Sequence, residues 1–340
     1  MRMDKSVASD SRLRKMKRRM PKEVWLVVVL LAVSAVIGVR NSVFLTPENF
    51  LDLLKGASVV GICALGMTFV ALTGGIDVSV GAIVACVAST IGTFMFRVPG
   101  FNNAAVVVVV AVAVGAALGG INGGLIGKVK MPPIVATLAT LAIFRGTLFL
   151  VTGGSWVNRQ DLPAWLKSLS LATVAGIPFQ VLVFAVLVII CWLVTRFTMF
   201  GRSVYAIGGS QTSAKRVGIN VDRTLIYVYL FAGALYGVAS LVHTTIMVGV
   251  DPNSFTGFEF KVIGAVFIGG IAIAGGRGNI FGAVIGVLLV AVISNGMVIA
   301  RIPSFWQQVV TGLIILFAIS FDVMQRRRIE SRLVKIDVDE

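Results

Sequence analysis

The sequence predicts an all-α, polytopic membrane protein with about ten transmembrane helices. Of its 340 residues, 57% are hydrophobic and 13% are charged, and the mean hydropathy is +0.95, whereas soluble domains are about a quarter charged. The apolar residues form long runs without the alternation of a β-barrel, and a bilayer core of about 30 Å needs roughly 20 such residues per helix. The spans are therefore expected to be helices.

Ten spans follow when the apolar runs are read against the charged or turn-rich segments between them. Residues 1–22 are predicted to be a basic cytoplasmic tail, 23–325 the transmembrane domain with a cytoplasmic loop at 196–223, and 326–340 a second cytoplasmic tail. In chain order, the expected spans are 24–39, 56–75, 78–96, 104–127, 131–152, 174–195, 225–249, 260–275, 280–299 and 305–321.

The distribution of basic residues predicts the orientation. With the N-terminus inside, 22 of the 30 Lys and Arg residues lie in cytoplasmic segments, seven lie outside, and Arg145 lies within a span. Cytoplasmic segments of helical membrane proteins are enriched in Lys and Arg, so we expect both termini to be cytoplasmic. The same rule explains the net charge of +15 without a nucleic-acid partner.

The sequence excludes several kinds of site. Cys63, Cys86 and Cys191 stand singly within spans, which predicts neither a disulfide framework nor a thiolate metal site. His243 is the only histidine, so multi-histidine metal sites are excluded, and it is read as a hydrogen-bonded helix residue. No GxxxxGK[ST] motif occurs, so ATP would have to bind to another chain.

Glycines at four-residue spacing predict close helix packing. One set occupies the fourth span and another begins the ninth, and small residues at this spacing let helix backbones approach in lipid. The two sets are Gly115, Gly119, Gly123 and Gly127, and Gly278, Gly282 and Gly286.

A lone carboxylate, Asp77, lies in the stretch "GGIDVSVG" at 74–81, between two long apolar spans. A glycine pair precedes it and Ser79 follows, which leaves two or three residues for the chain reversal. Two arrangements fit. Asp77 caps the third span at the inner surface by accepting amide hydrogens, or both helices break within the membrane and line a wet cavity.

Few other polar residues interrupt the spans, and they include Asn122 and Asn295. Thr137 and Thr140 are three apart on one helix face, where their hydroxyls can face a polyol or bond to carbonyls of their own helix. Arg145 lies about 9 Å from the outer end of its span at 1.5 Å per residue, so it can extend outward.

The loop at 196–223 contains a predicted short helix. Gly208 and Gly209 interrupt the chain, Ser210 can cap, and "QTSAKRVG" gives about two turns that end at Gly218. A helix this short is unstable alone in water, so we expect it to dock on a partner. Its small Ala214 and basic neighbours suit a groove on a soluble protein, although an ordinary positively charged loop would look similar.

Four segments resemble the ribose-type sugar permeases of bacterial ATP-binding cassette (ABC) importers, the second family of binding-protein-dependent permeases. They are "GGIDVSVGAIVA", "PPIVATLATLAIFRG", "GRSVYAIGGSQTSAKRVGI" and "GGIAIAGGRGNIFGAVIG", in family order between about residues 45 and 325. "TGGSWVN" at 152–158 and the segment 301–322 are similar to the autoinducer-2 and rhamnose branch.

The resemblance implies a type II-like permease that is not itself an enzyme and binds no cofactor. It implies a membrane-embedded dimer of identical or paired permeases, two cytoplasmic ATPases that bind ATP, and an external solute-binding protein that delivers the sugar. Ser210 stands where the family usually has Asn, which preserves capping. The implied ATPase-coupling residues are Gly201, Arg202, Gly208, Gly209, Ser210, Gln211, Ala214, Lys215, Arg216 and Gly218; the implied path residues are Asp77, Ser79, Asn122, Thr137 and Thr140.

Two other classes of protein fit the sequence less well. In an ion-coupled secondary transporter, Asp77 would be the coupling carboxylate, but such carriers usually hold more ionisable groups in the membrane than Asp77, Arg145 and Glu259. A membrane enzyme acting on lipid-linked sugar would need an acid pair. The expected topology places Asp77 and Glu259 near opposite faces of the membrane, which argues against that enzyme.

Overall fold

The computed structural model describes residues 22–98, 103–303 and 305–313, together with residues 316, 320 and 324. Eight helices in this part of the chain are long and apolar enough to cross a membrane, which confirms the predicted all-α membrane fold. The two predicted tails, apart from Lys22, lie outside the described residues. The eight helices are α2 (Lys22–Arg40), α3 (Pro47–Leu72), α4 (Val80–Arg97), α5 (Ala104–Gly127), α6 (Pro133–Thr152), α8 (Phe179–Phe197), α11 (Val221–Met247) and α13 (Ile280–Ile299).

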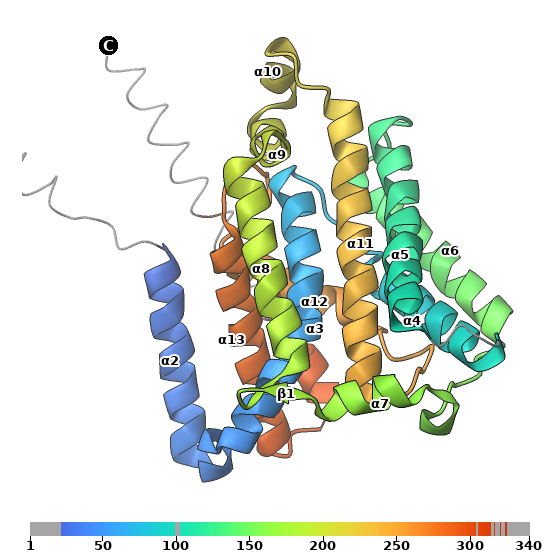
Figure 1. The fold of residues 1–340 in the computed structure, drawn as a ribbon. Coiled ribbons are helices and arrows are strands. Elements are labelled where there is room, and N and C mark those ends of the chain that lie inside the picture. Colours follow the sequence, from blue (N-terminus) through green and yellow to red (C-terminus); the bar gives the residue numbers. More distant parts are fainter. Residues whose placement is uncertain are drawn as a thin grey trace, which may run out of the picture.

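Shorter elements connect these helices. Between α6 and α8 lie η2 (Arg159–Asp161), α7 (Ala164–Leu171) and an antiparallel pair of strands, β1 (Thr173–Val174) and β2 (Ile177–Pro178), in which Thr173 pairs with Pro178 and Val174 with Ile177. The others are η1 (Ser42–Leu45), α9 (Met199–Gly209), α10 (Gln211–Arg216) and α12 (Phe258–Ile268). We call the two ends of the helix bundle the α10 end and the α7 end; they lie at the top and bottom of Figure 1.

Two of the ten expected spans are not found as single long helices in the described residues. The prediction of one continuous span over 260–275 is wrong: α12 has 11 residues, and an irregular glycine-rich segment follows it. Gly270, Gly275 and Gly276 have φ values of +86°, +85° and +70° there, a region that glycine adopts without a Cβ penalty. The last expected span is helical over 305–313, and most of its remainder lies outside the described residues.

The centre of the bundle is formed by α3 and α11, which pack against each other. Helices α4 and α5 pack on α11, while α8, α12 and α13 pack on α3 (Figure 1). Phe69 on α3 and Tyr229 and Tyr236 on α11 are among the largest fully buried side chains. Helix α6 packs on α4 and α5 at one edge, and α2 packs on α13 at the other.

The α5 glycines, and Gly282 and Gly286 of α13, lie at helix crossings, as predicted, whereas Gly278 precedes α13 and packs on Ile271. The α5 glycines face α11: a Cβ at Gly123 would lie 2.9 Å from the backbone of Ile226, and one at Gly119 would lie 2.9 Å from the Cα of Gly233. Gly286 of α13 approaches the backbone of α12 in the same way, where a Cβ would lie 2.7 Å from the amide nitrogen of Gly269. The backbones are therefore too close at these crossings for any side chain.

Two helices, α4 and α12, begin inside the bundle. The chain reaches α4 from the α10 end through residues 73–79, and it reaches α12 from the α7 end through residues 248–257. The second connection meets the first turn of α4, since a Cβ at Gly81 would lie 2.8 Å from the carbonyl oxygen of Phe255. Polar backbone inside a membrane protein is tolerated where the protein itself surrounds it.

Candidate functional site

The connection between α3 and α4 holds a buried polar network. Asp77 is 0% exposed. Its Oδ1 accepts hydrogen bonds from the backbone N–H of Ser79 (2.9 Å) and from the Ser79 hydroxyl (2.6 Å). Asp and Asn side chains commonly bond to the backbone two residues on, so this contact fixes the turn that leads into α4.

The network continues onto α5 and α6. Asn122 Nδ2 donates to Ser79 Oγ (2.8 Å), and Thr140 Oγ1 donates to Asn122 Oδ1 (2.6 Å). Asn122 lies five residues before the end of α5, about 7.5 Å into the bundle at 1.5 Å per residue. The side chains of three separate helix regions are thus joined below the α10 end.

Thr137 holds the same connection through its backbone. Its Oγ1 accepts from the N–H of Val78 (3.2 Å) and lies within hydrogen-bond distance of the carbonyl oxygens of Ile76 (3.1 Å) and Pro133 (2.9 Å). The structure thus brings together all five predicted path residues. All five are buried, and hydrogen bonds link them to one another or to the turn before α4. Their role in a solute path stays a prediction.

Of the two predicted arrangements of Asp77, the cap on α4 is not found, and the wet cavity stays a prediction. Its carboxylate bonds to Ser79, the residue that precedes α4, and not to the amides of the first turn of α4. Its second oxygen, Oδ2, has no hydrogen-bond partner among the described residues, and neither do the hydroxyls of Tyr229 and Tyr236. A carboxylate oxygen and two hydroxyls are thus buried together without a partner in the described part of the chain, which is unfavourable in an apolar core.

Glu259 lies close to this turn, which corrects the expected topology. A Cβ at Gly81 would lie 2.9 Å from Glu259 Oε2, so Glu259 stands beside the first turn of α4. The prediction that Asp77 and Glu259 lie near opposite faces is wrong, because α12 begins inside the bundle. Oε2 of Glu259, like Oδ2 of Asp77, has no partner within the described ranges.

Arg145 does not extend outward as expected. Its guanidinium donates to the carbonyl oxygens of Phe255 (2.9 Å) and Pro252 (3.3 Å), which hold the segment before α12 against α6. His243 packs its ring on Phe255 with centroids 4.4 Å apart, and its Nδ1 has no hydrogen-bond partner in the described part of the chain, so its expected bond is absent there.

The predicted short helix is present as α10, which projects beyond the ends of the long helices (Figure 1). The Ser210 hydroxyl caps it by accepting from the N–H of Ser213 (3.2 Å), and Gly218 ends it with φ +85°. Ala214 is only 2% exposed. Its side chain therefore packs on this chain and is not available to a partner's groove, contrary to expectation.

The surface of α10 that remains free is basic. Gln211, Lys215 and Arg216 are exposed, and Val217 just after the helix is 75% exposed. Arg202 on α9 is exposed as well, whereas Gly201 is buried against Thr195 at the crossing of α8 and α9.

Gly208 joins α9 to two other segments at the α10 end. A Cβ there would collide with the carbonyl oxygen of Leu72 and the amide of Gly276, and that amide donates to the same Leu72 oxygen (2.9 Å). The backbones of α9, of the end of α3 and of the segment after α12 are therefore in direct contact. We call this contact the glycine crossing.

Tyr205 adds a side-chain bond beside the glycine crossing. Its hydroxyl donates to the carbonyl oxygen of Gly278 (2.9 Å). Burial raises the pKa of Tyr205 above its ordinary value, because the phenolate would lose its hydration. The hydroxyl therefore stays protonated and able to donate at neutral pH.

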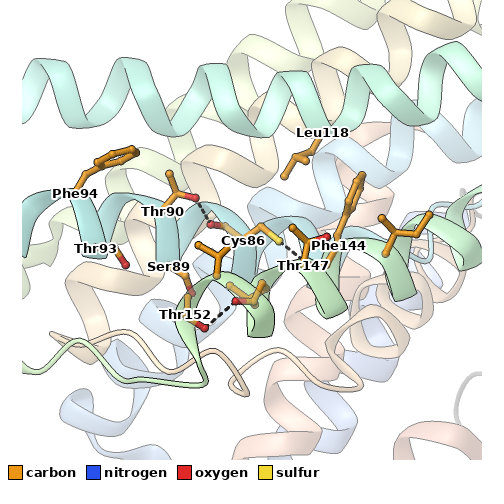
Figure 2. Close-up of a pocket in the computed structure, with 12 residues that line it drawn as sticks. Cys86, Ser89, Thr90, Thr93, Phe94, Leu118, Phe144, Thr147 and Thr152 are labelled. Atoms are coloured by element: carbon orange, nitrogen blue, oxygen red, sulfur yellow. Dashed lines mark hydrogen bonds between the residues drawn. The ribbon is translucent and has the colours of Figure 1, made fainter. Parts of the chain in front are cut away.

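The structure contains a cavity of about 550 Å³ between α4 and α6 that the sequence did not predict. Figure 2 shows Ser89, Thr90 and Thr93 on α4 with Thr147 and Thr152 on α6 around it. Hydroxyl residues at helical spacing on two successive spans were the available signal, but serine and threonine are common in membrane helices and bond to their own backbone.

Comparisons with known proteins agree with the resemblance drawn from the motifs. Residues 49–319 match the protein-family model described as "Branched-chain amino acid transport system / permease component". The chain is 33% identical to the ribose import permease protein RbsC of Escherichia coli K12 over 316 residues, which cover 90% of this chain and 96% of that protein.

Two further relatives have similar coverage. The chain is 36% identical to RbsC of Bacillus subtilis strain 168, covering 84% of this chain and 88% of that protein. It is 35% identical to the autoinducer 2 import system permease protein LsrC of Yersinia pseudotuberculosis, covering 89% and 85%. No solved structure gives a significant match.

Proposed function

Because this chain belongs to the family of branched-chain amino acid transport system permease components, we propose that it is the membrane-spanning permease of an ABC importer for a ribose- or autoinducer-2-type sugar. Relatives named for ribose import and for autoinducer 2 import match it over most of their length. The permease is not an enzyme, it has no cofactor, and ATP is bound and hydrolysed by a partner ATPase. The sugar is delivered by a solute-binding protein.

The observation that carries this proposal is α10. It is a capped helix of six residues that projects from the bundle, with its small side chain packed inward and its basic side chains outward. A helix this short has no stability of its own in water, so its exposure is best explained by a partner that covers it. The partner is the ATPase, and the α10 end is cytoplasmic.

The orientation follows from the same assignment. With the α10 end in the cytoplasm of a bacterial cell, both termini are cytoplasmic and the α7 end faces outward. The solute-binding protein then docks on the α7 end, where α7 and the β1–β2 pair form the longest outer connection. A second permease, identical or related, completes the path.

The mechanism is alternating access. Closure of the ATPases on ATP displaces α10 and α9, and the glycine crossing passes this displacement to the turn before Asp77 and to the segment after α12. These are the segments that lead into α4 and α13, so their movement opens and closes the helices around the solute. The sugar makes transient contacts with hydroxyls and amides, and no step needs a titrating group of this chain.

One alternative is kept because a specific observation favours it. Asp77 Oδ2 is buried without a partner among the described residues, and an ion-coupled carrier would use such a carboxylate. Asp77→Asn keeps the shape and the Oδ1 acceptor but removes the charge. An ABC permease retains ATP-dependent uptake in this variant, whereas an ion-coupled carrier loses its dependence on the proton or sodium gradient.

The deciding experiment is co-purification of the permease with its ATPase, combined with sugar uptake into reconstituted vesicles. Lys215→Glu with Arg216→Glu reverses the charge on α10, and Arg159→Glu at the α7 end is the matched control. We expect the control to retain the ATPase and the α10 variant to lose it. Uptake by the wild type without any bound ATPase would refute the ABC assignment.

A further inference from the structure

The connection between α11 and α12, residues 248–257, runs from the α7 end into the bundle, and we call it the strap. It consists of bends, turns and one isolated bridge residue, and Phe255 (2% exposed) and Val250 (4% exposed) are buried. Buried backbone groups that no helix or sheet pairs need other partners. The partners of the strap therefore decide where it lies.

The strap is held at two places. Val250 exchanges two backbone hydrogen bonds (3.0 and 2.9 Å) with Val157, which lies between α6 and α7. Further along, the guanidinium of Arg145 on α6 donates to the carbonyl oxygens of Pro252 (3.3 Å) and Phe255 (2.9 Å). The first attachment is to a connection, whereas Arg145 attaches the strap to a membrane-spanning helix.

The position of Arg145 is an unusual one for a charge. It lies about two turns before the end of α6, and a charged side chain within the membrane is costly unless it is paired. A long basic side chain near the end of a span can extend to the water, yet this one binds the strap. Ionisable residues within the membrane usually serve function, which directs attention to the contact between Arg145 and the strap.

Glu259, in the first turn of α12, supplies the opposite charge. It is 8% exposed, and the Arg145 charge acts on its carboxylate. A Cβ at Gly81 would lie 2.8 Å from the Phe255 carbonyl oxygen that Arg145 binds and 2.9 Å from Glu259 Oε2. The two charges therefore lie close together, where the strap ends and α12 begins.

The strap lies along one face of α4. Its inner part contacts Gly81, and a Cβ at Gly92 would lie 3.0 Å from Cγ2 of Val250. The two glycines are about three helical turns apart, so they lie on the same face of α4. Because the strap covers this face from the Asp77 network to the α7 end, a path that opens here toward the α7 end requires the strap to move.

Both ends of the strap have the backbone of a hinge. Val248, which follows α11, has φ +47°, and Gly257, which precedes α12, has φ +76°. A β-branched residue seldom adopts this left-handed region, and such strain is concentrated at switch segments, whereas glycine adopts it without a Cβ penalty. Rotation at these two residues moves the strap while α11 and α12 stay helical.

We propose that the strap closes the outer end of the permease and that Arg145 is the positioning residue that holds it closed. This inference rests on the proposed function, in which the α7 end faces outward. In the outward-open state the strap turns about its two ends, its carbonyl oxygens leave the guanidinium, and Val250 leaves Gly92. The Arg145 charge stays balanced by Glu259.

A cysteine in the strap reports its position. Val250→Cys in a Cys86→Ala chain is buried while the strap is closed, so its rate of reaction with a negatively charged, water-soluble maleimide measures opening. In the purified complex with the ATPase, we expect Arg145→Met to raise this rate at least about tenfold, the effect of losing a hydrogen bond from a charged donor.

Arg145→Lys is the conservative variant. It keeps a charged donor, so we expect the rate at Val250→Cys to stay within about threefold of the parent chain. Leu171→Cys, on α7 and 79% exposed, is the matched reporter and should react at one rate in all these chains. Equal rates at Val250→Cys in Arg145→Met and in the parent would overturn the role of Arg145.

A double variant separates positioning from folding. Arg145→Met leaves the buried Glu259 carboxylate without its counter-charge, and removing one partner of a buried charge pair is more damaging than removing both. We expect Arg145→Met with Glu259→Gln to assemble in wild-type amounts and still to react fast at Val250→Cys. A return to the parent rate would show that charge balance, and not the bonds to the strap, holds it closed, and would overturn the proposal.

Nucleotide tests the closure itself. AMP-PNP, a non-hydrolysable analogue of ATP, closes the ATPases, and we expect it to raise the rate at Val250→Cys about tenfold by shifting the population toward the outward-open state, with no change at Leu171→Cys. If AMP-PNP changes nothing in a complex that imports sugar with ATP, the strap is not the closure and the importer assignment stands. If the wild type binds no ATPase, the assignment fails, while the Arg145 series on the permease alone still reports whether Arg145 positions the strap.

Discussion

At the scale of single residues, the most informative feature is the hydrogen-bonded chain from Asp77 through Ser79 and Asn122 to Thr140. Each member is buried, and each link joins a different pair of side chains. Removing one partner from a buried pair leaves the other without compensation, which costs about 1–3 kcal/mol. The network should therefore be sensitive to small changes that leave the volume of the core unchanged.

Thr140→Val tests this sensitivity. The substitution keeps the size of the side chain but leaves Asn122 Oδ1 without its donor, so we expect a loss of about 1–3 kcal/mol of stability. Thr244→Val is the matched control, because Thr244 is equally buried but bonds to its own helix at Ser240. Thermal unfolding in detergent measures both. Equal losses in the two variants would show that the network adds nothing beyond a local hydroxyl bond.

At the scale of helices, backbone contact at glycines decides which elements touch. The crossing of α5 and α11 leaves no space for a Cβ at Gly119, whereas Gly120 has no atom within 4 Å of its Cβ position. In lipid, such close approach provides much of the attraction between helices. The adjacent pair therefore separates the packing effect of a methyl group from its effect on helix propensity.

Gly119→Ala and Gly120→Ala should change stability in opposite directions. We expect Gly119→Ala to destabilise by about 1–3 kcal/mol through overpacking and Gly120→Ala to stabilise by about 0.5–1 kcal/mol through helix propensity. Unfolding of the purified protein in detergent gives the comparison. A Gly119→Ala protein as stable as the wild type would contradict the close contact between α5 and α11 at this position.

Gly208 and Gly209 form a second such pair, at the glycine crossing. A Cβ at Gly208 would collide with the end of α3, while Gly209 faces open space. We expect Gly208→Ala to lower the unfolding temperature and Gly209→Ala to leave the stability within about 0.5 kcal/mol of the wild type, as for other substitutions away from packed features. If Gly209→Ala lowered the unfolding temperature more than Gly208→Ala, the assigned packing of α9 on the end of α3 would be wrong.

At the scale of the whole molecule, the proposed orientation places the α10 end in the cytoplasm. Arg159 and Lys215 are exposed at opposite ends of the bundle. In a Cys86→Ala background, we expect Arg159→Cys to react with a membrane-impermeant maleimide in intact cells. Lys215→Cys should react only after the membrane is opened. Reaction of Lys215→Cys alone in intact cells would reverse the proposed topology. Reaction of both variants in intact cells would exclude it.

Much of the fold could be predicted because each long apolar run specifies a helix locally. The glycine spacing also predicted close packing of α5, but a spacing defines a face and not its partner, so α11 could not be named. The position of Glu259 beside Gly81 was mispredicted because 260–275 reads as one span in hydropathy. Its division into a short helix and an irregular segment depends on contacts with Gly74 and Gly208 that are distant in sequence.

The candidate site was predicted to a similar extent. Polar residues inside apolar runs are rare, so Asp77, Ser79, Asn122, Thr137 and Thr140 could be selected, and the structure brings them together. Their mutual hydrogen bonds could not be predicted, because the depth of α4 in the bundle was unknown. Ala214 was assigned to the wrong side of α10, since a helix of six residues has too few positions for a hydrophobic pattern to distinguish its faces.

The glycine crossing also has a genetic consequence. Every first- or second-base change in a glycine codon that still encodes an amino acid places a carbon atom where Gly208 meets the carbonyl oxygen of Leu72. Every substitution of Gly208 is therefore expected to disrupt this contact, whereas position 209 can accept several residues. In a library of single-codon variants selected for growth on the imported sugar, we expect position 208 to be nearly empty beside a populated position 209.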